Sequence, residues 1–259
     1  MSEDQGAEDP AALWPQVRRV DAVAPWRWLR AGWSDFRQRP LASLFYGIVL
    51  AAMGLLLVRQ VGSGALALGL VTGFLLVGPF LATGLYAISR ACERGERIAF
   101  RQSLVAWRSN LGGYGFYAAL LALLLAVWLR VSVVVVALFF EGGMPHLGTL
   151  LRDLWQAPNG GAFLSVYLAA GAGFALFVYA LTAVSLPLLM DRPRLDALTA
   201  GIASLRAVVA NPVPALIWAL LIVVLTAIGF LSAGLGLILV LPLIGHASWH
   251  AYRDLLEPV

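Results

Sequence analysis

Long apolar runs, separated by short stretches that carry arginine, constrain this chain more than any other feature of its sequence. The runs are spread from Leu41 to Trp249. Hydrophobic residues make up 61% of the 259 positions and charged residues only 12%, whereas a soluble domain carries roughly 25% charged residues. A water-soluble fold is therefore excluded. We predict an all-α polytopic membrane protein with a single membrane domain over residues 26–259.

The lengths of the apolar runs predict six transmembrane helices. A bilayer core of about 30 Å needs roughly 20 apolar residues per helix, so the run from Val213 to Trp249 is divided in two near the glycines at its middle. Three prolines near the inner ends of the second, fourth and sixth spans predict kinks, namely Pro79, Pro187 and Pro242. The predicted spans cover about residues 41–58, 64–89, 113–140, 162–190, 213–231 and 233–249.

An amphipathic stretch precedes each pair of spans. In the first stretch the apolar residues recur three and four positions apart, as on one face of a helix, at Trp26, Leu29, Trp33 and Phe36. The order of amphipathic helix, span, turn and span occurs three times and predicts three helix-hairpin units. Tryptophan combined with arginine favours the headgroup layer of a membrane. A helix packed against a partner protein would show the same pattern.

The distribution of charge predicts the topology. All eighteen basic residues are arginine, and most of them lie in the N-terminal stretch, the two loops that hold amphipathic helices, and the C-terminus. By the positive-inside rule, both termini are cytoplasmic in a bacterial inner membrane. Residues 1–25, which are acidic and proline-containing, are predicted to be a disordered cytoplasmic tail. The arginines are scattered between apolar runs, so no nucleic-acid partner is predicted.

Small residues in the second predicted span point to close helix packing. Ala65, Gly69 and Gly73 repeat every four residues and would let another helix approach closely. The chain has a single cysteine, Cys92, which excludes an internal disulfide and any multi-cysteine metal site.

Several short stretches carry a resemblance to a known family. The stretch closest to the C-terminus, Gly245–Arg253, is the most specific of them. The others are Gly32–Phe36, Gly78–Phe80 with Tyr86–Arg90, Ser185–Pro187 with Asp191–Arg192, and Asn211–Pro212. The chain after Pro25 resembles the bacterial predicted integral membrane proteins grouped as domain of unknown function 2189. The resemblance implies the membrane architecture and no established activity, although some members are labelled as cytochrome oxidase subunits.

Two histidines are candidate metal ligands. His246 and His250 are four residues apart and share one face of a helix, so both imidazoles could reach one metal or haem iron. A defined site normally needs further ligands, and no cysteine or carboxylate lies nearby before Asp254. The alternative, which we favour, places the pair at the water boundary beside Trp249 and Tyr252 as interfacial aromatic residues.

Arg130 is the one charge placed inside a predicted span. At 1.5 Å per residue it lies about 25 Å from the start of the third span, close to the outer interface. The side chain is therefore expected to snorkel to the headgroups, with a buried anion site as the alternative.

No catalytic signature is present in the sequence, and the spans contain no carboxylate that could relay protons. We therefore predict a non-catalytic accessory, scaffolding or lipid-interacting membrane protein that needs no cofactor. Its partners would be the lipid bilayer and either another membrane protein or a second copy of the chain. Two alternatives stay open: a haem- or copper-binding subunit of a respiratory oxidase, and a channel or carrier for a small solute.

Overall fold

The computed structural model describes residues 15–59, 81–140 and 159–257. Within these ranges the chain is all-helical, as predicted, apart from turns and an isolated antiparallel bridge between Val17 and Leu256. Residues 81–93 are helical as well. The named helices are α1 (Ala24–Gln38), α2 (Pro40–Arg59), α4 (Phe100–Leu104), the 3-10 helix η2 (Ala106–Asn110), α5 (Leu111–Phe139), α7 (Gly160–Thr182), α8 (Ser185–Asp191), α9 (Ala197–Ala210), α10 (Pro212–Leu231) and α11 (Leu237–Leu255).

Three stretches of helix in the described ranges are long and apolar enough to cross a membrane: Ala106–Phe139, Gly160–Asp191 and Pro212–Leu231. The count rises to four if α1 and α2, which meet at a bend of 109°, are taken together as one span. Most of the second predicted span lies outside the described residues, and so do Gly69, Gly73 and Pro79. The six spans and the three hairpin units are accordingly not confirmed.

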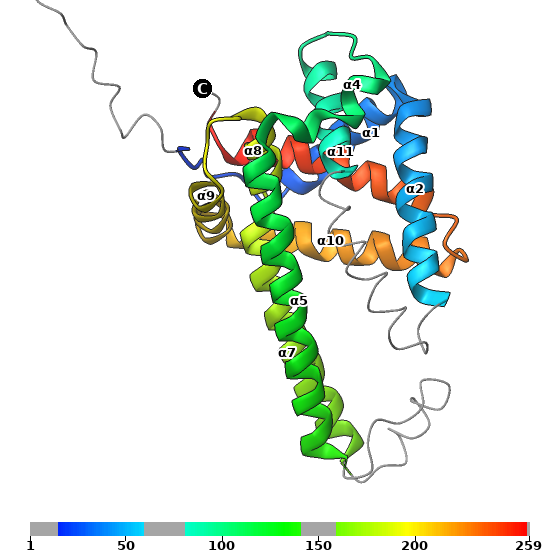
Figure 1. The fold of residues 1–259 in the computed structure, drawn as a ribbon, viewed down its shortest axis with the longest axis vertical. Coiled ribbons are helices and arrows are strands. Elements are labelled where there is room, and N and C mark those ends of the chain that lie inside the picture. Colours follow the sequence, from blue (N-terminus) through cyan, green and yellow to red (C-terminus); the bar gives the residue numbers. More distant parts are fainter. Residues whose placement is uncertain (1–14, 60–80, 141–158, 258–259) are drawn as a thin grey trace, which may run out of the picture.

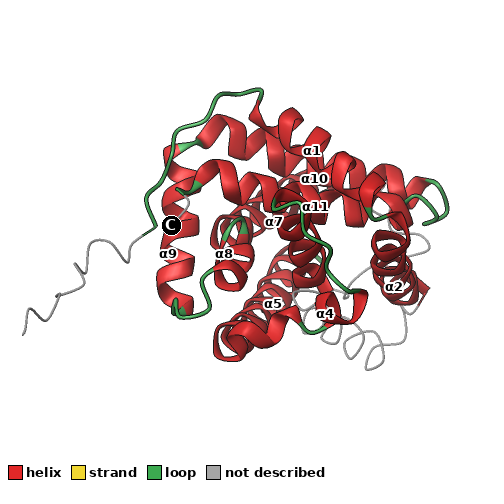
Figure 2. Ribbon diagram, turned by 90° about the horizontal axis from the view of Figure 1, so that it is seen from above, coloured by secondary structure: helices red, strands yellow, loops and turns green. Residues whose placement is uncertain are grey.

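The helices form two groups. The antiparallel helices α5 and α7 project together from the rest of the molecule, while α1, α2, α10 and α11 lie around the other end (Figure 1). The view from above in Figure 2 shows α9 and α8 on one side of this second group and α2 on the other. Helices α10 and α11 run across the direction of the α5–α7 pair in Figure 1, so this last hairpin is not oriented like the one before it.

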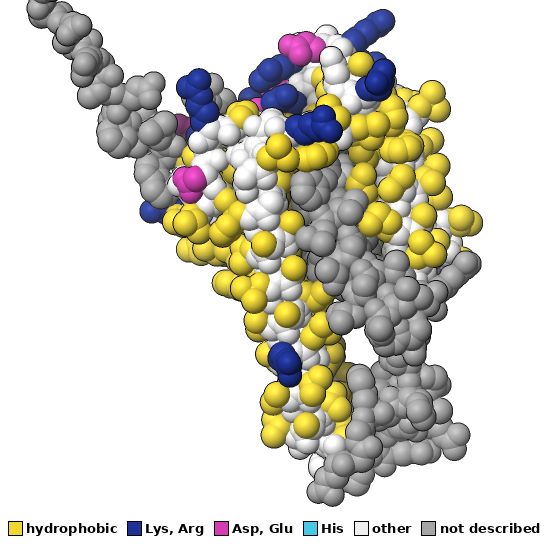
Figure 3. Space-filling model, in the orientation of Figure 1, with side chains coloured by type: hydrophobic (Ala, Val, Ile, Leu, Met, Phe, Trp, Pro, Cys, Tyr) yellow, Lys and Arg dark blue, Asp and Glu magenta, His cyan; other side chains and the backbone are white. Residues whose placement is uncertain are grey.

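Apolar and charged side chains occupy different parts of the surface. Figure 3 shows arginine and acidic side chains gathered at the end where α1, α4 and α8 lie, and hydrophobic side chains over α2 and the α5–α7 pair. On α5 the exposed side chains include Leu123, Val133 and Leu138, the last of them 74% exposed. Such a large apolar surface fits contact with lipid and would be unfavourable in water.

Proline positions explain one helix break. The fourth predicted span is interrupted at residues 183–184, between α7 and α8, and not at Pro187 itself. A proline ring clashes with the carbonyl four residues earlier, which here belongs to Ala183, and proline is tolerated in the first turn of a helix. Pro187 therefore ends α7 and occupies the start of α8.

Helix α11 is the centre of the packing, and it meets α1 and α2 at two close backbone approaches. Pro242 lacks the N–H that would bond to the carbonyl of Ile238, and α2 places Gly47 against that carbonyl: a Cβ at Gly47 would lie only 2.0 Å from the oxygen. On α1, a Cβ at Gly32 would lie 2.6 Å from the amide nitrogen of Ala247. Both positions therefore require glycine.

Candidate functional site

The C-terminal half of α11 carries a series of polar and aromatic side chains that bond to other segments of the chain. We call this set the α11 cluster. It consists of His246, Trp249, His250, Tyr252, Arg253 and Asp254, together with the residues to which they bond, which come from α1, α2, the 81–93 helix and α8.

His246 lies at the buried end of the cluster, with 0% of its surface exposed. Its Nε2 is 2.9 Å from the hydroxyl of Ser43, and its Nδ1 is 2.8 Å from the hydroxyl of Ser89. The Ser43 hydroxyl donates its hydrogen to the carbonyl of Arg39, so it accepts from His246 and Nε2 is the donor in that contact. In the neutral ring Nδ1 then accepts from Ser89. Both ring nitrogens are thus used in joining α2, the 81–93 helix and α11.

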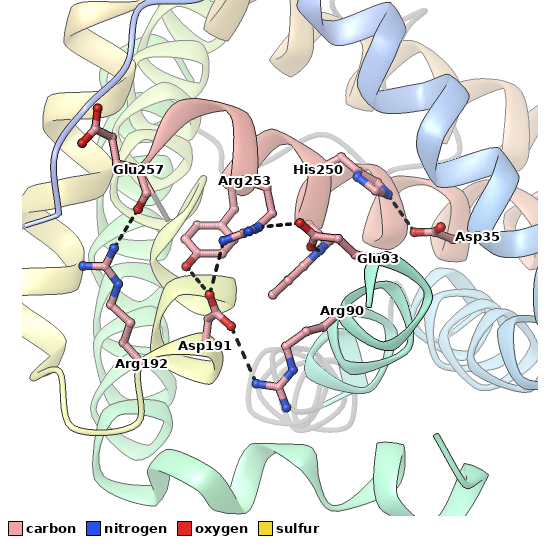
Figure 4. A network of polar contacts seen from close by, with 10 residues as sticks. Asp35, Arg90, Glu93, Asp191, Arg192, His250, Arg253 and Glu257 are labelled. Atoms are coloured by element: carbon pink, nitrogen blue, oxygen red, sulfur yellow. Dashed lines mark hydrogen bonds and ion pairs between the residues drawn. The ribbon is translucent and has the colours of Figure 1, made fainter. Parts of the chain in front are cut away.

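His250 bonds in a different direction. Its Nε2 is 2.7 Å from Oδ2 of Asp35, a carboxylate of α1 that is only 5% exposed (Figure 4). Ligation of one metal by both histidines, the less favoured interpretation of the sequence, would require these bonds to be broken. In the part of the chain that the structure describes, no group of three or more His, Cys, Asp or Glu residues is arranged to hold a metal ion.

Two carboxylates, those of Glu93 and Asp191, bond to three further side chains of the cluster (Figure 4). Glu93 accepts from Nε1 of Trp249 and Nε of Arg253, each at 3.0 Å. Asp191, at the end of α8, accepts from the hydroxyl of Tyr252 at 2.8 Å, with Arg90 at 3.7 Å and Arg253 at 3.8 Å. Burial raises the pKa of Tyr252 above its ordinary value, so the hydroxyl stays protonated and serves as the donor.

The remaining member of the cluster connects α11 to α1. Asp254 Oδ2 accepts from Nε1 of Trp28 at 2.9 Å. Trp28 is 2% exposed, whereas Trp26 and Trp33 are 58% and 44% exposed. The apolar spacing predicts Trp26 and Trp33 on the same face as Phe36. The structure instead buries Trp28 and Gly32 against α11 and leaves the other two tryptophans on the surface. Phe36 is buried as well and stacks with Trp33.

Both ends of the described chain are held beside the cluster. The amide of Arg18 donates to the carbonyl of Leu255 at 2.8 Å, and the amide of Glu257 donates to the carbonyl of Gln16 at 2.9 Å. The side chain of Asn211 accepts from the amide of Val20 and donates to the carbonyl of Arg18. This part of the predicted tail is therefore ordered by backbone pairing.

The other predicted positions lie away from the cluster or within its packing. Arg130 is exposed on α5, and no hydrogen bond or ion pair within the described ranges holds it. Pro187 is buried at the start of α8, and Pro242 is buried inside α11 against α2. His246 was placed at the water boundary from the sequence, whereas the structure encloses it completely together with Trp249 and Tyr252.

Sequence reasoning did not identify the residues that bond to the α11 side chains as functional residues. Ser43, Ser89, Asp35 and Glu93 are each far from α11 in the sequence; Ser43 and His246, for example, are separated by 203 positions. A signal was nevertheless present, because the stretches that carried the family resemblance converge here. Gly32–Phe36, Ser89–Arg90, Asp191 and Gly245–Arg253 all contribute contacts to this one cluster.

The comparison with family models covers only part of the stretches that converge here. No curated protein and no solved structure matches the chain. A family model described as a predicted integral membrane protein matches residues 66–191, which include Ser89, Arg90 and Asp191 and stop before α11. The match is narrower than the resemblance predicted from the sequence, and the family's function is unknown. Over residues 66–191 the chain is similar to the predicted integral membrane protein family, domain of unknown function 2189.

Proposed function

We propose that this protein is a non-catalytic membrane scaffold, in which the α11 cluster fixes the ends of several helices at one membrane surface. The proposal rests on the hydrogen bonds that the polar side chains of the cluster form with other segments. Each polar side chain of α11 from His246 to Asp254, apart from Ser248, bonds to a residue of another segment. Ser248 bonds to a carbonyl of α11 itself.

Such pairing suits a structural role. Reactive groups in an active site are directed toward a substrate, whereas the imidazole of His246 is enclosed between Ser43 and Ser89. Buried polar groups that are fully paired give a unique arrangement of the surrounding helices, and removing one partner is costly. The cluster would therefore hold α1, α2, the 81–93 helix and α8 in register on α11.

The proposed membrane setting follows from the distribution of side chains. We place the apolar helices in a bacterial inner membrane with both termini in the cytoplasm, and the α11 cluster at the cytoplasmic surface. In support, arginines gather at the cluster end of the molecule (Figure 3). On α1, Trp26 and Trp33 are exposed, as is Arg30. Tryptophan and arginine are the residues expected among anionic headgroups.

Labelling of Cys92 tests the topology. Cys92 lies at the end of the 81–93 helix and is partly exposed. Burial raises the pKa of its thiol, so labelling with an impermeant maleimide should be slow at neutral pH and faster at mildly alkaline pH. We expect labelling only after permeabilisation of the inner membrane. Labelling from the periplasmic side would overturn the orientation.

Purification from the native membrane tests the scaffold role against the redox alternative. We expect no Soret band and no stoichiometric copper in the purified protein. A haem or copper signal that disappears in His246→Gln and in His250→Gln would overturn the scaffold proposal and favour an oxidase-associated subunit.

A further inference from the structure

A basic pocket lies beside the α11 cluster, between the end of the 81–93 helix and the short helices α4 and η2. Its volume is about 390 Å³. Three arginines line it, Arg90, Arg94 and Arg97, together with the carboxylate-bearing Glu96. Three positive charges against one negative charge leave the lining at +2.

Two of these arginines are available to a ligand. Arg90 lies 3.7 Å from Asp191 and is partly compensated. Arg94 and Arg97 are exposed and form no ion pair with any residue that the structure describes. Gln102 also lines the pocket; its Oε1 accepts from the amide of Ala99 at 3.1 Å, and its NH₂ group donates to no other residue that the structure describes. Planar guanidinium groups bind phosphate oxygens in a bidentate manner, so the pocket suits a phosphate group.

An apolar groove adjoins the basic pocket, and Ile98 lines both. The groove has a volume of about 560 Å³ and is lined by Pro40, Leu41, Phe45, Ile88 and Phe100. Leu41 is 83% exposed, and Phe45 is 41% exposed. Arg39, at the rim of the groove, donates to the carbonyl of Glu96 at 3.4 Å and so connects the walls of the two sites.

We infer that the pocket and the groove together bind one anionic phospholipid. The phosphate lies among Arg90, Arg94 and Arg97, and an acyl chain lies in the groove beside Leu41 and Phe45. A free phosphate would not contact the apolar groove, and an apolar ligand without charge would not bind Arg94 and Arg97. The inference rests on the proposed function, because it places this end of the molecule at the headgroup level of the bilayer.

The test compares lipid retention by the full-length protein and its variants. The protein is reconstituted in vesicles of equal parts phosphatidylglycerol and phosphatidylcholine, extracted in mild detergent, and analysed by native mass spectrometry. We expect the wild type to retain phosphatidylglycerol in preference to phosphatidylcholine. Arg94→Gln combined with Arg97→Gln should lower the affinity for phosphatidylglycerol roughly tenfold or more, since two charge-assisted contacts are lost.

A matched control removes the same charge elsewhere. Arg19 and Arg194 are exposed and line neither site, so Arg19→Gln combined with Arg194→Gln should change the affinity by less than about twofold, because exposed charges away from the site are screened. The lipid is also displaced with inorganic phosphate, which competes for the arginines. Leu41→Gln should weaken phosphatidylglycerol binding and leave the binding of inorganic phosphate unchanged.

Three results would overturn the inference. The first is equal retention of the two lipids by the wild type. The second is equal binding of phosphatidylglycerol by the wild type and the double arginine variant. The third is full displacement by inorganic phosphate with no effect of Leu41→Gln, which would assign the pocket to a free anion. None of them bears on the scaffold role, which is tested by the haem and copper measurements and by the stability of α11 cluster variants.

Discussion

The cluster end of the molecule and the α5–α7 pair hold their helices together in different ways. Around α11 the helices meet through hydrogen bonds to buried side chains and through glycines that let backbones touch. Between α5 and α7 the contacts are mainly aromatic, such as Trp128 against Tyr167 with ring centroids 5.5 Å apart. Only 11% of the most apolar part of α5 is buried. The cluster end is held together by contacts within the protein, whereas the exposed apolar surface of the α5–α7 pair needs lipid to cover it.

This difference indicates which positions of the chain tolerate substitution. A buried polar group that loses its partner costs about 1–3 kcal/mol, and a side chain forced against a backbone costs a similar amount or more. A lipid-facing apolar position has neither a bonded partner nor a closely fitting neighbour. The free energy of unfolding should therefore respond to substitutions near α11 far more than to substitutions on the exposed faces of α5.

The largest effect is expected at the contact between α2 and α11. In Gly47→Ala the new Cβ would lie 2.0 Å from the carbonyl oxygen of Ile238, and backbone atoms of two helices would have to separate. We expect a loss of about 3 kcal/mol or more in the free energy of unfolding in detergent.

Gly54→Ala is the matched control on the same helix. A Cβ at Gly54 meets nothing within 4 Å, so this variant should be as stable as the wild type or gain about 0.5–1 kcal/mol from helix propensity. Equal behaviour of the two glycine variants would refute the close approach of α2 and α11.

The second prediction concerns the buried imidazole. His246→Leu would leave the hydroxyl of Ser89 without its ring partner and would remove the donor to Ser43, and both serines are 0% exposed. We expect a loss of about 2 kcal/mol in the free energy of unfolding, measured by thermal or denaturant unfolding of the purified protein.

A serine of the α5–α7 pair provides the comparison. Ser132 receives only a long 3.4 Å contact from the hydroxyl of Tyr167, so Ser132→Ala should change stability by no more than about 0.5 kcal/mol. A larger effect at Ser132 than at His246 would reverse the contrast between the two regions.

A third, smaller effect is expected at the start of α9. The carboxylate of Asp196 accepts from the amide of Thr199 at 2.8 Å and from its hydroxyl at 2.6 Å. The hydrogen bond from the hydroxyl, followed by that from the amide, holds the pKa of Asp196 below its ordinary value. Asp196→Ala should cost about 1 kcal/mol at neutral pH.

The pH dependence of that effect follows from the direction of the pKa shift. A lowered pKa in the folded state stabilises the fold above the ordinary aspartate pKa of about 3.9, and this stabilisation is lost as the pH falls through the folded value. The difference between wild type and Asp196→Ala should therefore shrink in acid. A constant difference from neutral pH to about pH 3 would exclude the carboxylate as the cap.

The smallest effect is expected at Arg130. Its side chain is exposed on α5 and has no polar partner in the described parts of the chain, so Arg130→Gln should change stability by about 0.5 kcal/mol or less. A loss comparable with that of His246→Leu would show that Arg130 is held in a buried anion site.

Much of the local structure could be predicted from the sequence. The predicted spans 113–140 and 213–231 agree with α5 (Leu111–Phe139) and α10 (Pro212–Leu231) to within two residues at each end. The predicted division near the middle glycines is also observed, because Ala233 and Gly234 adopt positive φ in the turn between α10 and α11. Hydropathy, proline and glycine act within a few residues, and a single stretch of sequence is enough to reveal them.

Long-range pairing could not be predicted in the same way. Composition and local patterns were enough to indicate the class of protein, most of the helices and the candidate histidines. Only the tertiary structure decided that Trp28 and not Trp26 is buried, that His246 lies between Ser43 and Ser89, and that Asp35 and Glu93 pair with α11. An amphipathic pattern shows that one side of a helix is apolar, but it does not distinguish a lipid from another helix as the surface that covers it. The partner of a buried polar group depends on which distant segments pack beside it, and that is determined only when the whole chain folds.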